Sequence, residues 1–176
     1  MPKPIAADYP EYFGKYISQV AEEDLTEAFK NQFPKIEHLL RSIDEEKAGY
    51  AYAPGKWTLK ELLQHIIDGE RIFNYRALCF ARKEATSLPS FDENLYADNS
   101  NANARSWKSL SNEFINVRRS TEDLFKSFSN EMLQQKGIAN NNSISVLSLG
   151  FITVGHITHH IKVIEERYLV KSVVSA

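Results

Sequence analysis

Four long segments of this chain carry apolar residues at helical spacing, and this pattern constrains the fold more than any other feature. The segments run from about Asp24 to Glu46, Leu59 to Arg82, Asn103 to Phe128 and Ile144 to Leu169. Within each, hydrophobic residues recur three or four positions apart, which is typical of a helix that buries one face. Strand-like alternation is scarce. The sequence therefore predicts an all-α chain whose long helices pack as a four-helix bundle.

Capping signals mark where two of these helices begin. Thr58 and Glu61 form a capping box before the second helix, and Asp24 with Glu27 resembles one before the first. Pro34 lies inside the first helix. Because proline removes a backbone hydrogen bond, we expect it to kink or restart that helix.

The segments between the long helices are rich in turn residues. The stretch from Lys83 to Ser100 has no period and reads as a long connection, which in a compact domain is usually functional or a crossover. Residues 137–143 are predicted to form a loop, with Ser143 capping the fourth helix. A shorter aromatic helix is expected from Tyr9 to Val20.

Length and charge limit the class of protein. The 176 residues fit a single domain covering 1–176, and the one cysteine, Cys79, cannot form a disulfide within the chain. The net charge is -2 with no basic stripe, which argues against a nucleic-acid partner. No apolar run approaches the roughly 18 residues of a membrane span, and the first ten residues lack the apolar stretch of a secretory signal. A cytoplasmic protein without nucleic-acid or membrane partners is expected.

The histidines are the residues that point to chemistry. His156 and His160 are four residues apart in the fourth helix, so both face the same side, with Cβ atoms about 5–6 Å apart. Two such imidazoles can reach one metal ion, although this pair lacks the glutamate of the zinc-protease motif. His65 in the second helix adds a third nitrogen, because bundles build metal sites from inward side chains on facing helices. Three protein ligands leave further positions for water or substrate, which is typical of a catalytic metal site.

Glu70 is the candidate proton acceptor of such a site. Metal-assisted chemistry needs a base near the ion, and Glu70 follows His65 on the second helix. A carboxylate on the apolar side of a helix is uncommon unless it is paired. The alternative is therefore an interhelical ion pair with Arg118, Arg119 or Arg167.

Three more residues carry open interpretations. His159, beside His160, either supports a metal ligand or substrate from the second shell or makes an interhelical hydrogen bond. Arg76 either binds a substrate anion or is structural. His38 is expected at the surface or in packing.

The chain resembles the DinB/YfiT-like superfamily of metal-dependent enzymes over nearly its whole length after residue 8. The resemblance rests on residues 52–58, 61–73, 75–78, 88–94, 155–156, 159–161 and 166–168. It implies a four-helix bundle with a long crossover between helices 2 and 3, a metal held by His65, His156 and His160, and a homodimer. Nickel and zinc are the metals that it implies. Some members are S-transferases that use a low-molecular-weight thiol, and others are described as hydrolases.

Three functions stay open at this point. The favoured one is an enzyme with an open three-histidine metal site, which acts on a small-molecule substrate as a thiol-dependent S-transferase or a hydrolase. The second is a non-catalytic metal-binding bundle, in which the ion ties two helices together. The third is a bundle with no physiological metal. Imidazole nitrogen suits zinc, copper, iron and nickel, which predicts a divalent transition metal as the cofactor. The resemblance narrows the expected metal to nickel or zinc.

Overall fold

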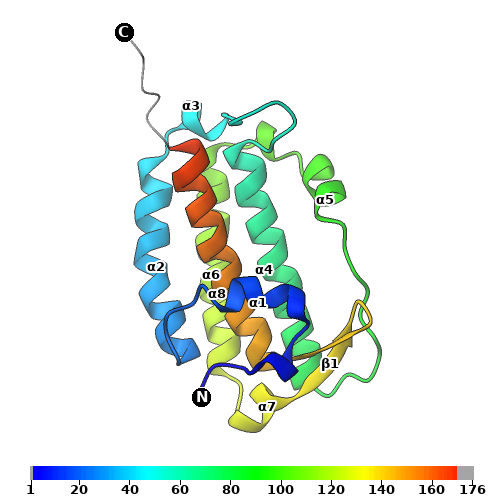
Figure 1. The fold of residues 1–176 in the computed structure, drawn as a ribbon. Coiled ribbons are helices and arrows are strands. Elements are labelled where there is room, and N and C mark those ends of the chain that lie inside the picture. The colour runs from blue at the N-terminus through cyan, green and yellow to red at the C-terminus, as the bar shows by residue number, and fades with distance from the viewer. Residues whose placement is uncertain (1, 170–176) are drawn as a thin grey trace.

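The computed structural model describes residues 2–169, so Met1 and residues 170–176 of the expected domain lie outside the description. Four long helices dominate it: α2 (Leu25–Ser42), α4 (Leu59–Ala81), α6 (Trp107–Lys126) and α8 (Val146–Val163) (Figure 1). A π-helical turn, η4 (Ile164–Tyr168), continues α8. The predicted all-α four-helix bundle is confirmed. Within residues 2–169, no helix is both long and apolar enough to cross a bilayer.

The long helices run in two directions. In Figure 1, α2 and α8 rise from the lower end of the bundle, whereas α4 and α6 descend toward it. α4 packs against α6 and α8, and α2 packs against the same two helices. Because α4 and α6 follow one another and are parallel, the chain must travel back along the bundle between them. Residues 82–106 make this return and form the expected crossover.

Side-chain caps fix the starts of α2 and α4 as the sequence predicts. Thr58 Oγ1 accepts a hydrogen bond from the backbone N–H of Glu61, and the Glu61 carboxylate accepts one from the backbone N–H of Thr58, at 3.1 and 2.8 Å. The Asp24 carboxylate accepts from two backbone N–H groups in the first turn of α2. Each cap satisfies donors that a helix start otherwise leaves without partners.

Of the two effects expected of Pro34, a kink or a restart of the helix, the restart is wrong. The helix runs unbroken through Pro34 to Ser42, and a separate turn, α3 (Glu45–Ala48), follows. Pro34 and Lys30, whose carbonyl loses its helical donor, both lie on the exposed side of the helix. Water can satisfy that carbonyl, so the helix tolerates the proline there.

The crossover is not irregular throughout. It contains a helix, α5 (Glu93–Asn99), and a 3-10 turn, η3 (Ala102–Ala104). Asp92 caps α5 by accepting hydrogen bonds from two backbone N–H groups. Leu88 forms a parallel bridge with Ala139. The bridge therefore ties the first part of the crossover to β1.

The predicted loop at 137–143 is a β-hairpin. Its strands are β1 (Lys136–Ala139) and β2 (Asn142–Ser145), paired antiparallel. The two residues of the turn, Asn140 and Asn141, have positive φ angles of 50° and 59°. A two-residue hairpin turn of type I′ requires positive φ at both positions, and asparagine adopts it more readily than most residues.

The hairpin also moves the start of α8. A short helix, α7 (Asn130–Gln134), precedes it, and Ser143 pairs with Ile138 inside the hairpin. Ser145, not Ser143, caps α8 by accepting a hydrogen bond from the backbone N–H of Ser148. The expected cap was two residues early because the second strand was not recognised.

The expected aromatic helix from Tyr9 to Val20 is shorter than predicted, because a 3-10 turn, η2 (Glu11–Phe13), leads directly into α1 (Gly14–Ile17) and the helix ends there. A separate turn, η1 (Ala6–Asp8), precedes it. Pro10 lies between η1 and η2 and is extended. Proline has a fixed φ and no N–H, so a continuous helix cannot pass this point easily.

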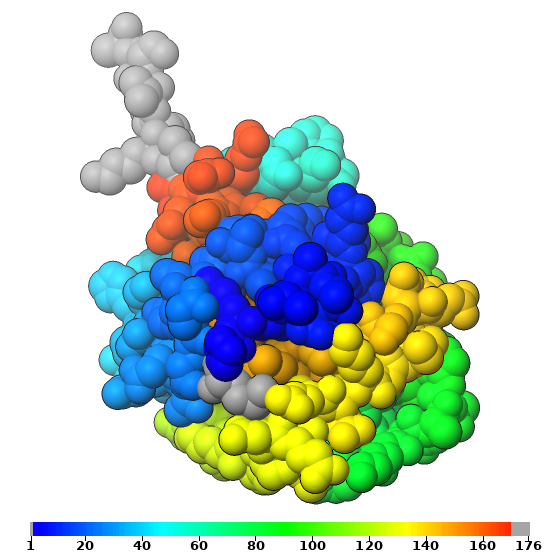
Figure 2. Space-filling view, turned by 60° about the horizontal axis from the view of Figure 1, so that its bottom comes forward, coloured from blue at the N-terminus to red at the C-terminus, as the bar shows by residue number. Residues whose placement is uncertain are grey.

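This N-terminal segment packs across α8 and against the hairpin. Figure 2 shows it in blue beside the yellow and orange atoms of the hairpin. The Lys136 ammonium lies 2.9 Å from the Asp8 carboxylate and donates to the Ala7 carbonyl. A Cβ at Gly155 would lie only 2.2 Å from the Tyr16 carbonyl oxygen. Glycine at 155 is therefore what allows α1 to lie directly on α8.

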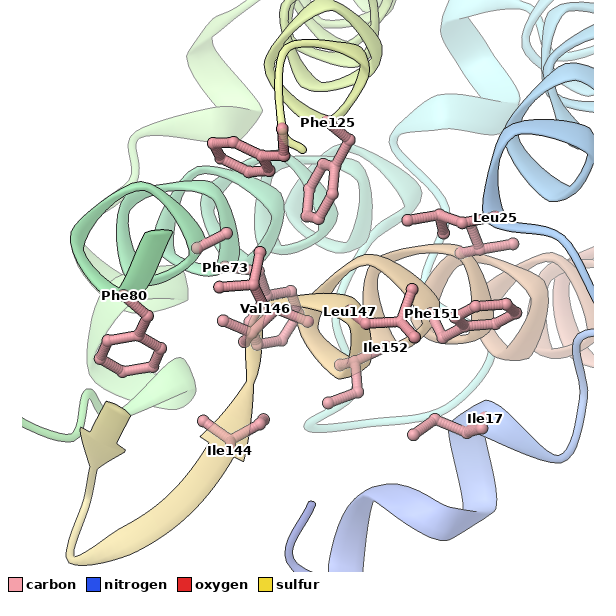
Figure 3. Packing of buried hydrophobic residues seen from close by; sticks show 14 of the residues in the cluster. Ile17, Leu25, Phe73, Phe80, Phe125, Ile144, Val146, Leu147, Phe151 and Ile152 are labelled. Atoms are coloured by element: carbon pink, nitrogen blue, oxygen red, sulfur yellow. The ribbon is translucent and has the colours of Figure 1, made fainter. Parts of the chain in front are cut away.

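The core is divided into two apolar clusters, one toward each end of the bundle. The cluster near the hairpin includes Phe73, Phe80, Phe125 and Phe151 (Figure 3). The cluster at the opposite end is built around residues 36–43, 59–67, 107–114 and 157–168. Burying this much apolar surface is the main favourable contribution to folding.

A buried polar network lies between the two clusters. Arg118, with no exposed surface, donates from Nε and Nη2 to the two oxygens of Glu70, at 3.1 and 3.0 Å. Its Nη1 donates to Gln32 at 2.9 Å, and Gln32 donates to Thr158 and to the carbonyl of Val154. The network of Gln32, Glu70, Arg118, Val154 and Thr158 therefore joins all four long helices.

Replacing Arg118 with methionine is expected to destabilise the protein by about 3–5 kcal/mol, because the Glu70 carboxylate stays buried without its partner. The double variant Glu70→Leu/Arg118→Met is expected to be more stable than Arg118→Met, since no unpaired charge remains. Denaturant unfolding measures both values. Arg119→Met, at the exposed neighbouring position, is the control and should change stability little. Equal stability of the single and double variants would contradict this view of the pair.

Candidate metal centre

The structure brings His65, His156 and His160 together between α4 and α8. His156 Nε2 lies 3.1 Å from His65 Nε2 and 3.0 Å from His160 Nε2. One ligand atom from each residue lies within 4.8 Å of the others. His65 is in the second turn of α4, and α4 packs directly against α8. The helical spacing of 156 and 160 and the packing of these two helices together produce the cluster.

The donor set fits a divalent transition metal ion. All three residues turn Nε2 toward a common point. A tetrahedral zinc ion with Zn–N bonds of about 2.0–2.1 Å holds its ligand nitrogens about 3.3 Å apart. The two nitrogen–nitrogen distances of 3.0 and 3.1 Å are close to that separation.

The three imidazoles are neutral near pH 7, which metal ligation requires. Burial lowers the pKa of His65 from its ordinary 6.5 to about 4, against the opposing field of Glu93. Burial, followed by the charges of the neighbouring histidines, holds the pKa values of His156 and His160 well below 6.5. A neutral imidazole keeps a lone pair for an ion.

Aromatic rings hold the histidine rings in place. The Trp57 ring lies 4.8 Å from the His65 ring, and the Tyr16 ring meets the His156 ring edge-on at 5.3 Å. Gly69 lies against the other side of His156, where a Cβ would come within 3.3 Å of Cε1. Nδ1 of His160 is buried and has no hydrogen-bond partner in the part of the chain that is described.

A cavity of about 530 Å³ opens onto the cluster, and all three histidines line it. This volume is within the usual range for small-molecule sites. Six aromatic side chains contribute to its wall: Tyr12, Phe13, Tyr16, Trp57, Phe73 and Phe91. A ligand in the cavity can therefore reach an ion held by the histidines.

Glu70, the candidate base, instead forms an interhelical ion pair with Arg118, which was the alternative role predicted for it. Both of its oxygens accept hydrogen bonds from Arg118, and the carboxylate also accepts one from Thr121. It does not line the cavity. The reason is helical geometry, because five residues after His65 correspond to about 140° around the helix. The Glu70 carboxylate is therefore not placed to take a proton from a group bound at the histidines.

His159 lies beside the cluster without bonding to it. Its ring packs edge-on against Tyr16 at 5.5 Å and against His160 at 5.1 Å. Over residues 2–169, neither the hydrogen bond to a ligand nor the interhelical hydrogen bond expected of it is present. His38 is exposed, as predicted, and Arg76 lines the cavity.

The polar residues that the non-helical segments bring to the cavity were not predicted as site residues. They are Ser90 and Glu93 from the crossover, and Asn140 and Asn142 from the hairpin. Two signals were available for the crossover: its length, because long connections in compact domains are often functional, and the family resemblance of residues 88–94. Nothing in the hairpin sequence pointed to the site.

Two features define the class of this protein. One is a four-helix bundle with a long crossover between its second and third long helices, and the other is a histidine cluster between its second and fourth long helices. The chain belongs to the DinB superfamily, whose sequence profile matches residues 14–164. A solved structure from Bacillus subtilis, YfiT, is described as "a probable metal-dependent hydrolase with an unusual four-helix bundle topology". It superposes with a TM-score of 0.70 at 17% identity, covering 93% of this chain and 90% of that one, and shows the same fold. A comparison with curated proteins finds no match.

Metal-free protein is expected to lose stability as the pH falls from about 6.5 toward 4. The folded-state pKa of each cluster histidine is lowered, so the unfolded chain binds more protons in this window and acid favours unfolding. Replacing His156 with asparagine should reduce the slope of the free energy of unfolding against pH by about 1.4 kcal/mol per pH unit. Denaturant unfolding at a series of pH values in the presence of chelator measures it. An unchanged slope in His156→Asn, matching the exposed control His38→Asn, would refute the expectation.

Proposed function

We propose that the protein is a metal-dependent enzyme that binds one divalent transition ion, nickel or zinc, through His65, His156 and His160. The observation that carries the proposal is the convergence of three neutral Nε2 atoms at the wall of a small-molecule cavity. Three protein ligands are typical of catalytic metal sites, whereas structural zinc sites are usually closed by four.

When bound, such an ion acts as a Lewis acid that polarises a substrate oxygen and lowers the pKa of a water or thiol. The residues of the chain have separate parts in this scheme. The three histidines would hold the ion, and neutral ligands would leave its positive charge uncompensated. The aromatic wall excludes water from the apolar part of a substrate. Glu93, which lines the same cavity, is the proposed proton acceptor, through an oxygen of its side chain.

We propose hydrolysis of a small molecule as the reaction class. The description of YfiT as a probable metal-dependent hydrolase supports it, because this chain shares that fold. Transfer of a low-molecular-weight thiol is the second candidate, which the resemblance to thiol-dependent S-transferases favours. A non-catalytic role, in which the ion ties α4 to α8, is the alternative from another class. The homodimer and the cytoplasmic location stay predictions.

Purified protein is expected to carry about one nickel or zinc ion per chain. His156→Ala should abolish stoichiometric binding, because two remaining nitrogens rarely retain an ion against a chelator. Elemental analysis after dialysis measures the content, with His38→Ala, at an exposed site, as the control. Full occupancy in His156→Ala would overturn the ligand assignment.

Metal-dependent turnover separates the enzyme from the non-catalytic bundle. On a panel of esters, amides and thiol–electrophile pairs, Glu93→Gln should lower kcat by about 10²-fold or more with unchanged metal content, which is the effect of losing a general base. Asp98→Asn, an exposed carboxylate on the same helix α5 that does not line the cavity, should leave kcat unchanged. The structural role would be favoured if no substrate class is turned over and if the visible spectrum of cobalt-loaded protein does not change when thiols or anions are added.

A further inference from the structure

Arg76 places a positive charge in the cavity. Its side chain is only 7% exposed and lines the same cavity as the histidines. It follows His65 by eleven residues on α4, which is three helical turns. Both residues therefore lie on one face of α4, with Cα atoms about 16 Å apart. Arg76 and the histidines thus belong to different parts of one cavity.

The Arg76 guanidinium has no carboxylate partner among residues 2–169. It donates one hydrogen bond, from Nη2 to the carbonyl of Pro89 at 2.8 Å, and lies 6.0 Å from the centroid of the Phe91 ring. The other arginine that is comparably buried, Arg118, is fully neutralised by Glu70. Burial lowers the pKa of Arg76, but a guanidinium stays protonated in proteins. A buried charge is expensive unless it is paired, so an anion that enters the cavity would relieve this penalty.

The rest of the wall restricts what that anion is. Arg76 is the only Lys or Arg among the described residues that line the cavity, and Glu93 adds a negative charge. A single guanidinium matches the charge of a carboxylate, whereas a phosphate dianion would stay undercompensated. The planar fork of donors also matches the two oxygens of a carboxylate. The aromatic rings between the two regions suit an apolar body.

We propose that Arg76 binds the carboxylate of a small substrate whose apolar body lies along the aromatic wall and whose reacting group lies at the histidines. The position of the reacting group rests on the proposed function. Carboxylate binding at Arg76 does not, because it needs no metal ion.

Metal-free protein with chelator present tests the subsite alone, since a carboxylate cannot then bind through an ion. The probes are acetate, phenylacetate and 4-phenylbutyrate, each compared with its amide by calorimetric or NMR titration. The carboxylates should bind at least tenfold more tightly than the amides, and more tightly as the apolar body grows. If none of the carboxylates binds, or if they bind no better than the amides, the proposal is wrong.

Arg76→Gln should remove the preference for carboxylate over amide, and Arg76→Lys should retain part of it. The control is Arg82→Gln, an exposed arginine after the same helix, which should keep the full preference. If Arg76→Gln does not fold, the Arg76→Lys variant and the NMR shift of the Arg76 Nε–H on adding phenylacetate decide the matter. Retained preference in Arg76→Gln, or no shift at Arg76 Nε–H, would overturn the assignment. All of these titrations use metal-free protein, so their outcome does not depend on whether the metal site has been assigned correctly.

Discussion

The buried charge of Arg118 is the constraint on which the rest of the structure depends. A guanidinium with no exposed surface is stable only while Glu70 and Gln32 meet it, and these partners come from α4 and α2. Gln32 in turn bonds the carbonyl of Val154, two residues before His156. Sliding any long helix by one turn would break this network. The network therefore fixes the register of α4 against α8, and with it the separation of His65 from His156.

Helices and connecting segments contribute different parts of the cavity. The rigid helices hold the histidines and Arg76, so the distance between the two polar regions is fixed by the pitch of α4. The N-terminal segment, the crossover and the hairpin contribute most of the remaining wall, including Tyr16, Glu93 and Asn140. Connecting segments tolerate changes in sequence better than helices in a packed core. Substitutions in these segments can therefore change the selectivity for substrates without disturbing the histidine cluster.

The sequence predicted the parts of the molecule that follow from local periodicity. Helix spacing located the four long helices, and the i, i+4 pair with one histidine on a facing helix identified the cluster. The sequence could not decide between a base and an ion-pair role for Glu70. The answer depends on which neighbouring helix packs against the face of α4 that carries it. The hairpin was missed since each strand has four residues and the turn is Asn-Asn rather than a glycine turn. Glu93 was missed because its place in the cavity depends on three segments that meet only in the folded chain.

The contact of Tyr16 with Gly155 has a consequence for the order of events during synthesis. These residues are 139 positions apart, so α1 can pack onto α8 only after nearly the whole described chain has left the ribosome. Closing so long a loop is slow relative to forming local helices. His65 emerges before its two partners, and His156 follows it by 91 residues. Until then the nascent chain carries only one of the three ligands, which holds metal poorly, and the complete site appears only when the protein can enclose it.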